Sequence, residues 1–166
     1  AQKVSLGSEV TLRGPGGGYA PDPNASAHPF VGDLAALPAI EVALAAPAPQ
    51  ATGQVLIAIT DPGDQRPLDT HLEVQWICDP TLTVAFDRTI AAVQALPTST
   101  NCQAFVPGEA GFVRQLRRHL KVDSGLVGDR LSISGYWKLG RDDAGWRQEK
   151  REWSAPVDEA EAAVTG

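Results

Sequence analysis

Two cysteines are the clearest covalent signal in the chain. Cys78 follows an alternating apolar stretch, and Cys102 lies in the turn-like segment 98–102. A disulfide between them would close a loop of about 25 residues and contribute roughly 3.5 kcal/mol in the chain-entropy model. The even cysteine count favours this bond, and the bond implies an extracellular, periplasmic or virion setting. Two separate thiols in the cytoplasm are the alternative.

Known motifs of catalysis are missing from the sequence. No serine has the flanking glycines of a nucleophile elbow, and neither His-Glu-x-x-His nor Cys-x-x-Cys occurs. Asp61, Asp64 and Asp69 could offer oxygen ligands to calcium, but their spacing is not that of an EF-hand, and Asp-Pro-Gly is a common turn. The sequence therefore predicts no enzyme, no cofactor and no metal, with calcium at these aspartates as a secondary candidate.

Charge is distributed unevenly along the chain. The net charge is −6, yet residues 114–151 carry ten basic and five acidic side chains. Such asymmetry is typical of a surface that meets a partner of opposite sign, although pairing with the acidic remainder of the same chain explains it equally well. An acidic protein is repelled by nucleic acid, which leaves a protein partner. The candidate basic face consists of Arg114, Arg117, Arg118, Lys121, Arg147, Lys150 and Arg151.

Aromatic residues follow the same basic stretch. Tyr136, Trp137 and Trp146 flank a turn-forming segment at 140–145, which predicts a β-hairpin. Aromatic side chains beside basic ones are typical of a face that binds a polysaccharide or another acidic polymer. Burial in the core is the simpler explanation for tryptophans.

Period-two alternation of apolar residues predicts most of the elements. Alternating apolar residues indicate strands at 4–13, 39–46, 54–60, 72–79, 81–87, 130–138 and 145–154, whereas 89–96 fits a helix or a strand. Asp33 is expected to cap a short helical turn that ends before Pro38. Seven of the 13 prolines lie between residues 14 and 50, which indicates an extended arm.

These elements predict an antiparallel β-sandwich, Ig-like or jelly-roll-like, of about seven or eight strands. The expected division is a strand and Gly/Pro-rich arm at 1–50, a sandwich body at 51–156 and an acidic tail at 157–166. An arm of this kind favours a non-enzymatic structural subunit of a larger assembly, such as a virion capsid, cement or tail component or a cell-envelope complex. A secreted module that binds carbohydrate or an acidic polymer is the alternative.

The ends of the sequence bear on its setting. The chain starts at Ala1 and has no methionine, which fits a cleaved signal peptide or a trimmed initiator Met. No apolar run approaches the roughly 18 residues of a membrane span. We therefore expect an extracellular, periplasmic or virion protein.

Overall fold

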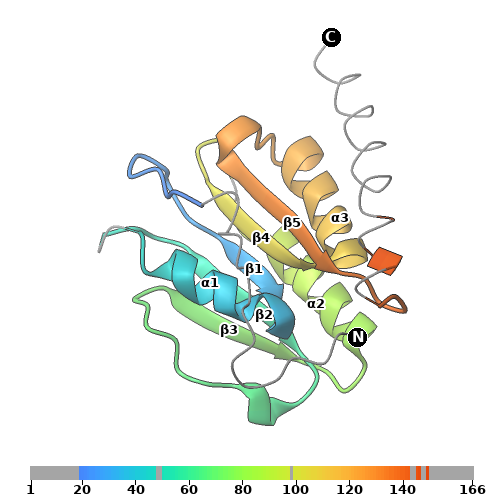
Figure 1. The fold of residues 1–166 in the computed structure, drawn as a ribbon. Helices are drawn as coiled ribbons and strands as arrows, with labels where there is room; N and C mark the ends of the chain where they lie inside the picture. The colour runs from blue at the N-terminus through green and yellow to red at the C-terminus, as the bar shows by residue number, and fades with distance from the viewer. Residues whose placement is uncertain (1–18, 48–49, 98, 143–144, 147–148, 150–166) are drawn as a thin grey trace, which may run out of the picture.

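A computed structural model describes residues 19–47, 50–97, 99–142, 145–146 and 149. Five strands form one sheet in the order β3-β2-β1-β4-β5, and every neighbouring pair is parallel (Figure 1). The strands are β1 (Phe30–Asp33), β2 (Gln54–Ile59), β3 (Glu73–Cys78), β4 (Ala104–Glu109) and β5 (Leu131–Trp137). All five carboxyl ends therefore lie at one edge, called here the carboxyl edge, and all five amino ends lie at the opposite amino edge.

Helices cover both faces of this sheet. The main helices are α1 (Leu37–Leu44), α2 (Leu82–Gln94) and α3 (Ala110–Arg118), and the shorter turns are η1 (Leu34–Ala36), η2 (Pro62–Asp64), the π-helical η3 (His119–Asp123) and η4 (Gly128–Arg130). Helix α1 packs with Phe30, Val55 and Ile57 on one face. Helices α2 and α3 pack with Val31, Leu56 and Val106 on the other. The result is a three-layer α/β/α architecture.

The chain changes direction across the sheet at one point. It runs from β1 outward to β2 and β3, and then returns to place β4 on the other side of β1. Such a reversal, between β1 and β4, opens a crevice at the carboxyl edge where doubly wound proteins bind ligands. The fold thus singles out the ends of β1 and β4.

The predicted antiparallel sandwich is wrong. Strands at 54–59, 73–78 and 131–137 are confirmed, but they pair in parallel, and helices join them. Residues Val55–Ile59 of β2 are buried without a break, which is typical of a strand covered on both faces. A half-exposed sandwich strand would bury alternate residues only.

Two predicted strands are helical. Residues 39–46 fall largely in α1, and 81–96 contains α2. The buried residues of α2 recur at helical spacing: Ala85, Phe86, Thr89, Ile90 and Val93. The local alternation at 81–87 obscured this longer period.

The predicted arm is also wrong where the structure describes it. Strand β1 lies at the centre of the sheet, between β2 and β4, and α1 follows it directly. The predicted hairpin is absent among the described residues, because β5 pairs with β4 in parallel and the chain is helical at 145–146. The strand predicted at 4–13 and the tail at 157–166 lie outside the described residues.

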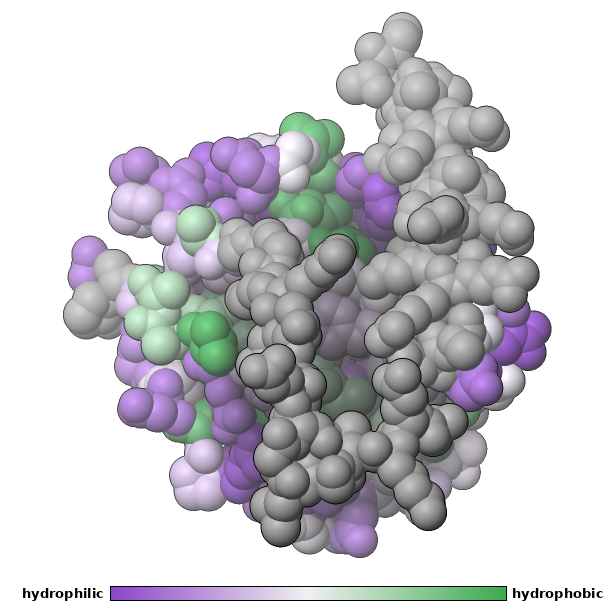
Figure 2. Space-filling view, in the orientation of Figure 1, coloured by the Kyte–Doolittle hydropathy of each residue, from purple (hydrophilic) through white to green (hydrophobic). Residues whose placement is uncertain are grey.

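The visible described surface is mainly hydrophilic, as expected when helices cover both faces of the sheet (Figure 2). Where described residues are visible in Figure 2, hydrophilic residues dominate and hydrophobic ones show in small groups. Over the described part of the chain, no helix has the length and apolar character of a membrane span.

Candidate functional site

Asp33 organises the carboxyl edge. It is the last residue of β1 and only 2% exposed. Its Oδ1 accepts a hydrogen bond from the Ala36 N–H at 3.0 Å, while Oδ2 accepts from the Glu109 N–H at 2.7 Å and from Trp137 Nε1 at 2.9 Å. Burial raises the pKa of Asp33, and these donors oppose the rise. One carboxylate thereby joins the ends of β1, β4 and β5.

Glu109 extends the same arrangement at the end of β4. It is 6% exposed and caps α3, since its Oε2 accepts from the Phe112 N–H at 2.7 Å. Its Oε1 accepts from the Leu139 N–H at 3.1 Å, beyond the end of β5. Both buried carboxylates therefore accept hydrogen bonds from N–H donors of the backbone, and Asp33 also from the Trp137 indole.

Two glycines allow β1 and β4 to approach this closely. A Cβ at Gly32 would lie 2.7 Å from both the Pro107 carbonyl oxygen and Ile40 Cδ1. Gly108 has a φ of +156°, which favours glycine, and a Cβ there would lie 3.1 Å from Asp33 Oδ2. The close approach of the strand ends that carry Asp33 and Glu109 thus requires glycine at positions 32 and 108.

A cavity of about 350 Å³ opens at this edge. Its walls come from the ends of β1, β2 and β5 and from the first turn of α2. They consist of Asp33, Leu34, Ala35, Ala58, Ile59, Thr60, Leu82 and Trp137. The lining is mainly apolar, with the Asp33 carboxylate and the Thr60 hydroxyl as its polar groups. Such a lining is typical of a site that binds a small organic molecule with a few polar groups.

The cavity lies where the strand order reverses, which is where doubly wound proteins bind dinucleotides. Helix α2 starts at the cavity, and its N-cap Thr81 makes no side-chain capping bond. The Asp79 carboxylate accepts a hydrogen bond from the Thr81 N–H at 2.9 Å, so a negative charge already lies at the start of this helix. The N–H groups of the turn after β1 bond to the Asp33 carboxylate. The apolar cavity is therefore the part of this edge that could hold a ring of a dinucleotide.

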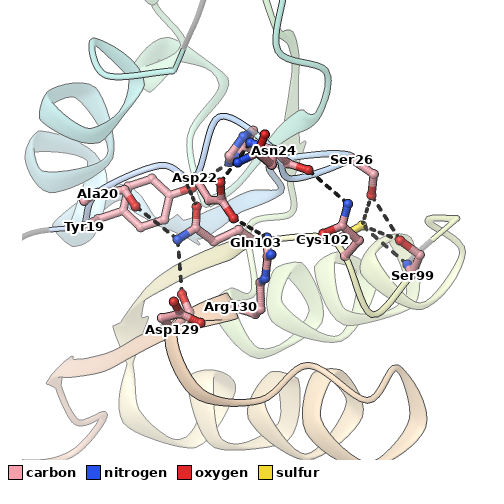
Figure 3. A network of polar contacts seen from close by, with 12 residues as sticks. Tyr19, Ala20, Asp22, Asn24, Ser26, Ser99, Cys102, Gln103, Asp129 and Arg130 are labelled. Carbon is pink, nitrogen blue, oxygen red and sulfur yellow. Dashed lines mark hydrogen bonds and ion pairs between the residues drawn. The ribbon is translucent and has the colours of Figure 1, made fainter.

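The amino edge carries a separate polar network, shown in Figure 3. Buried Gln103 accepts from the Asp22 N–H at 2.6 Å and donates to the carbonyl oxygens of Ala20 and Asp129, both at 3.1 Å. Arg130 pairs with Asp22 at 2.9 Å. These contacts fasten the segment before β1 to the start of β4 and β5.

His28 and Cys102 are buried in the same region. The Tyr19 hydroxyl lies 3.0 Å from His28 Nδ1, and burial lowers the pKa of His28. Cys102 borders a cavity of about 250 Å³. Burial alone would raise the pKa of Cys102, but the Ser99 N–H and the hydroxyls of Ser26 and Ser99 outweigh it and lower the value.

The predicted disulfide is wrong. Cys78 and Cys102 are free thiols. Cys78 ends β3 at the carboxyl edge, whereas Cys102 precedes β4 at the amino edge. Strands of six residues separate these edges by roughly 20 Å, far beyond the span of a disulfide. Because the strands pair in parallel rather than antiparallel as predicted, the end of β3 and the start of β4 lie at opposite edges of the sheet.

The candidate aromatic face is not assembled. Tyr136 and Trp137 are neighbours in β5 and point to opposite faces of the sheet. Tyr136 is 42% exposed, Trp137 lines the cavity, and Trp146 is 2% exposed against Gly135. Of the three, Trp137 alone borders the candidate site.

The candidate basic face falls on α3 and the turn after it. Arg114, Arg117 and Arg118 lie on α3, and Lys121 lies in η3. Arg147, Lys150 and Arg151 are outside the described residues. Binding of a protein partner here stays a prediction.

The calcium candidate is not formed as a cluster. Asp61 caps η2, Asp64 ends η2, and Asp69 lies further along the loop to β3. Among the described residues, no group of three or more His, Cys, Asp or Glu side chains could hold a metal.

Sequence reasoning found one site residue in a structural role and missed another. The prediction that Asp33 caps the turn after β1 is confirmed, but the prediction that the turn ends before Pro38 is wrong, because Pro38 lies in the first turn of α1. Glu109 was missed, although its position three residues before Phe112, at the start of an apolar helical pattern, is where an N-cap acceptor is expected.

Comparison with known proteins places these features in a family. The family model described as "Siderophore-interacting protein" matches residues 25–140. An uncharacterized protein of Mycobacterium tuberculosis is 36% identical over 99% of this chain and 61% of its own length. The ferric vibriobactin reductase ViuB of Vibrio cholerae is 31% identical over 90% of this chain and 57% of its own length.

A solved structure shows the same fold. The siderophore-interacting protein SipS of Aeromonas hydrophila has a TM-score of 0.71 at 23% identity, over 78% of this chain and 52% of that one. This chain thus spans about three fifths of the curated relatives that it matches.

These matches overturn the predicted non-enzymatic structural subunit and its alternative, a secreted polymer-binding module. A relative that aligns with 90% of the chain is named as a reductase. The mistake followed from the missing motifs, because a site built from single residues at the ends of β1, β2, β4 and β5 leaves no local motif to find. With a family model covering residues 25–140 and the matching α/β sheet, the chain belongs to the siderophore-interacting protein family.

Proposed function

We propose that this chain is the dinucleotide-binding part of a ferric-siderophore reductase. In this proposal a nicotinamide dinucleotide bound at the carboxyl edge supplies electrons that reduce siderophore-bound Fe(III) to Fe(II). The observation that carries it is the cavity lined by Asp33, Thr60 and Trp137, at the reversal point of a sheet in this family. The name of the Vibrio cholerae relative supports iron reduction as the reaction.

The described residues serve to hold the dinucleotide rather than to react. Asp33 fixes the Trp137 indole at the cavity through the 2.9 Å bond to Nε1. Trp137, Leu34 and Leu82 supply apolar walls that exclude water from a bound ring.

Electron counting adds one requirement. When bound, a nicotinamide supplies hydride, which carries two electrons, whereas Fe(III) accepts one. A carrier that takes the pair and releases single electrons, such as a flavin, is therefore part of the proposal. We assign none of the described residues to it.

The free cysteines bear on the predicted compartment. The extracellular, periplasmic or virion setting was predicted largely from a disulfide. Because both cysteines are free, the disulfide gives that setting no support.

Binding and reduction can be tested together. Calorimetry would measure dinucleotide binding to the purified protein, and an anaerobic assay with ferric vibriobactin would follow Fe(II) through a ferrous chelator. Ala35→Trp fills the cavity from an exposed position and should weaken dinucleotide binding at least tenfold. Ala91→Trp, at an exposed position of α2 outside the cavity, is the matched control.

Two results would count against the proposal. One is dinucleotide binding that Ala35→Trp leaves unchanged, since the cavity would then not be the site. The other is the absence of dinucleotide binding altogether.

A further inference from the structure

A second cavity lies at the amino edge, at the opposite end of the strands from the candidate dinucleotide site. Its volume is about 250 Å³. The segment before β1, the start of β2, the segment after α2 and Cys102 form its walls. Among the described residues, none lines both this cavity and the one at the carboxyl edge. The amino-edge cavity is therefore a separate site.

The lining of this cavity is mainly apolar, and its polar side chains bond to groups of the protein. The Thr52 hydroxyl donates to the Ser26 carbonyl oxygen at 2.8 Å. Gln54 Nε2 donates to Glu73 Oε2 at 2.9 Å. Such walls favour a small apolar molecule, and the Cys102 thiol is the nucleophilic group that they place beside it.

Hydrogen-bond donors converge on the Cys102 sulfur (Figure 3). The Ser99 backbone N–H donates to Sγ at 3.4 Å, and the hydroxyl oxygens of Ser26 and Ser99 lie 3.6 and 3.7 Å from it. The two hydroxyl oxygens are 3.0 Å apart, so one can donate to the other while the second donates to the sulfur. Burial alone would raise the pKa of Cys102, but these donors outweigh it and lower the value. The nucleophilic thiolate is thus stabilised at the wall of the cavity.

We propose that Cys102 is a site of covalent modification by small apolar electrophiles of the α,β-unsaturated aldehyde class. The thiolate sulfur adds to the β-carbon of the aldehyde. A C–S bond forms as the π bond of the C=C group breaks, and water supplies a proton to the neighbouring carbon, so no oxidant or reductant is consumed. Because Cys102 is only 2% exposed, the cavity is the route to its sulfur and disfavours large or charged reagents. This modification goes beyond the proposed reduction and does not depend on it.

The test compares the two cysteines of the same molecule. The purified protein would be treated with crotonaldehyde, the adducts trapped with borohydride, and each cysteine followed over time by peptide mass spectrometry. Cys78 is the more exposed thiol, so exposure alone predicts that Cys78 reacts first. We expect Cys102 to react at least severalfold faster in the folded protein, and the two rates to become similar in urea.

A substitution in the cavity wall tests the route to the sulfur. Pro97→Trp fills the cavity from an exposed position and should slow the reaction of Cys102 severalfold, while the rate at Cys78 stays the same. Ala91→Trp, at an exposed position of α2 outside this cavity, is the matched control.

Three results would overturn the proposal. One is reaction of Cys78 as fast as that of Cys102, or faster, in the folded protein. Another is a Cys102 rate that Pro97→Trp leaves unchanged. The third is a preference for Cys102 that persists in urea, since it would then come from the neighbouring sequence and not from the cavity. The comparison of the two cysteines needs no variant, so it decides the matter even if Pro97→Trp fails to fold.

Discussion

The two edges of the sheet use polar residues in different ways. At the amino edge, Gln103, Asp22 and Arg130 bond to one another and to backbone groups (Figure 3). At the carboxyl edge, Asp33 and Glu109 accept bonds almost entirely from backbone N–H groups, and a cavity remains beside them. The first arrangement fastens the segment before β1 to the strands, whereas the second joins the ends of β1, β4 and β5 beside the cavity.

This difference separates stability from binding. Polar groups that satisfy each other stabilise the join between the segment 19–28 and the strands. Carboxylates satisfied by backbone donors are held rigidly while the apolar walls stay open to a ligand. Substitutions at the amino edge should therefore affect folding alone, and those at the carboxyl edge should affect folding and binding together.

Asp33→Ala should have the largest effect. It leaves the N–H groups of Ala36, Glu109 and Trp137 without their acceptor. Unsatisfied buried donors cost about 1–3 kcal/mol each, so we expect a loss of roughly 3 kcal/mol or more in unfolding free energy. Chemical denaturation would measure it, with exposed Asp69→Ala as control. Equal losses in the two variants would show that Asp33 does not organise the edge.

Gln103→Leu should destabilise the protein by about 2 kcal/mol, because three part-buried hydrogen bonds to the backbone of Ala20, Asp22 and Asp129 are lost. Dinucleotide affinity should stay within about twofold of the original, since each edge acts independently. Gln115→Leu, on the exposed side of α3, is the control. A large loss of dinucleotide affinity in Gln103→Leu would show that the amino edge affects binding as well as stability.

The two aspartates should titrate on opposite sides of the ordinary value of 3.8. The Asn24 N–H and Arg130 lower the pKa of Asp22, so its contribution to stability is present above pH 3.8 and is lost as the pH falls through the lowered pKa. Burial raises the pKa of Asp33, so its contribution to stability declines as the pH rises from 3.8 through the raised pKa.

Carboxyl ¹³C titration by NMR would measure both values. Arg130→Gln should raise the pKa of Asp22 and leave that of Asp33 unchanged. If both aspartates titrated on the same side of 3.8, the expected difference between the amino and carboxyl edges would be contradicted.

The smallest effect concerns the thiols. Mass spectrometry of unreduced, denatured protein after alkylation should find both Cys78 and Cys102 modified. Ser26→Ala removes a hydroxyl 3.6 Å from Cys102 Sγ, which should raise the pKa of Cys102 and slow its alkylation in the folded protein a few-fold. Ser134→Ala, exposed on β5, is the control. An unmodified protein lighter by two hydrogens would establish the disulfide instead.

Local patterns in the sequence predicted three of the five strands and one cap, but not β1 or β4. The apolar run at 54–59 and the alternation at 73–78 and 131–137 identified β2, β3 and β5, and Asp33 was recognised as a cap. These predictions held because side-chain periodicity and capping depend on residues close together in the chain. Helix α2 was missed because a period-two stretch lies inside its helical period.

The site depended on contacts that local patterns do not contain. Asp33 bonds to residues 76 and 104 positions away in the sequence. Whether strands pair in parallel is decided by burying both sheet faces under helices, which is a property of the whole chain. That choice set Cys78 and Cys102 at opposite edges and brought Asp33, Glu109 and Trp137 together. The sequence by itself determined where most strands form, and the tertiary structure decided which of their ends meet.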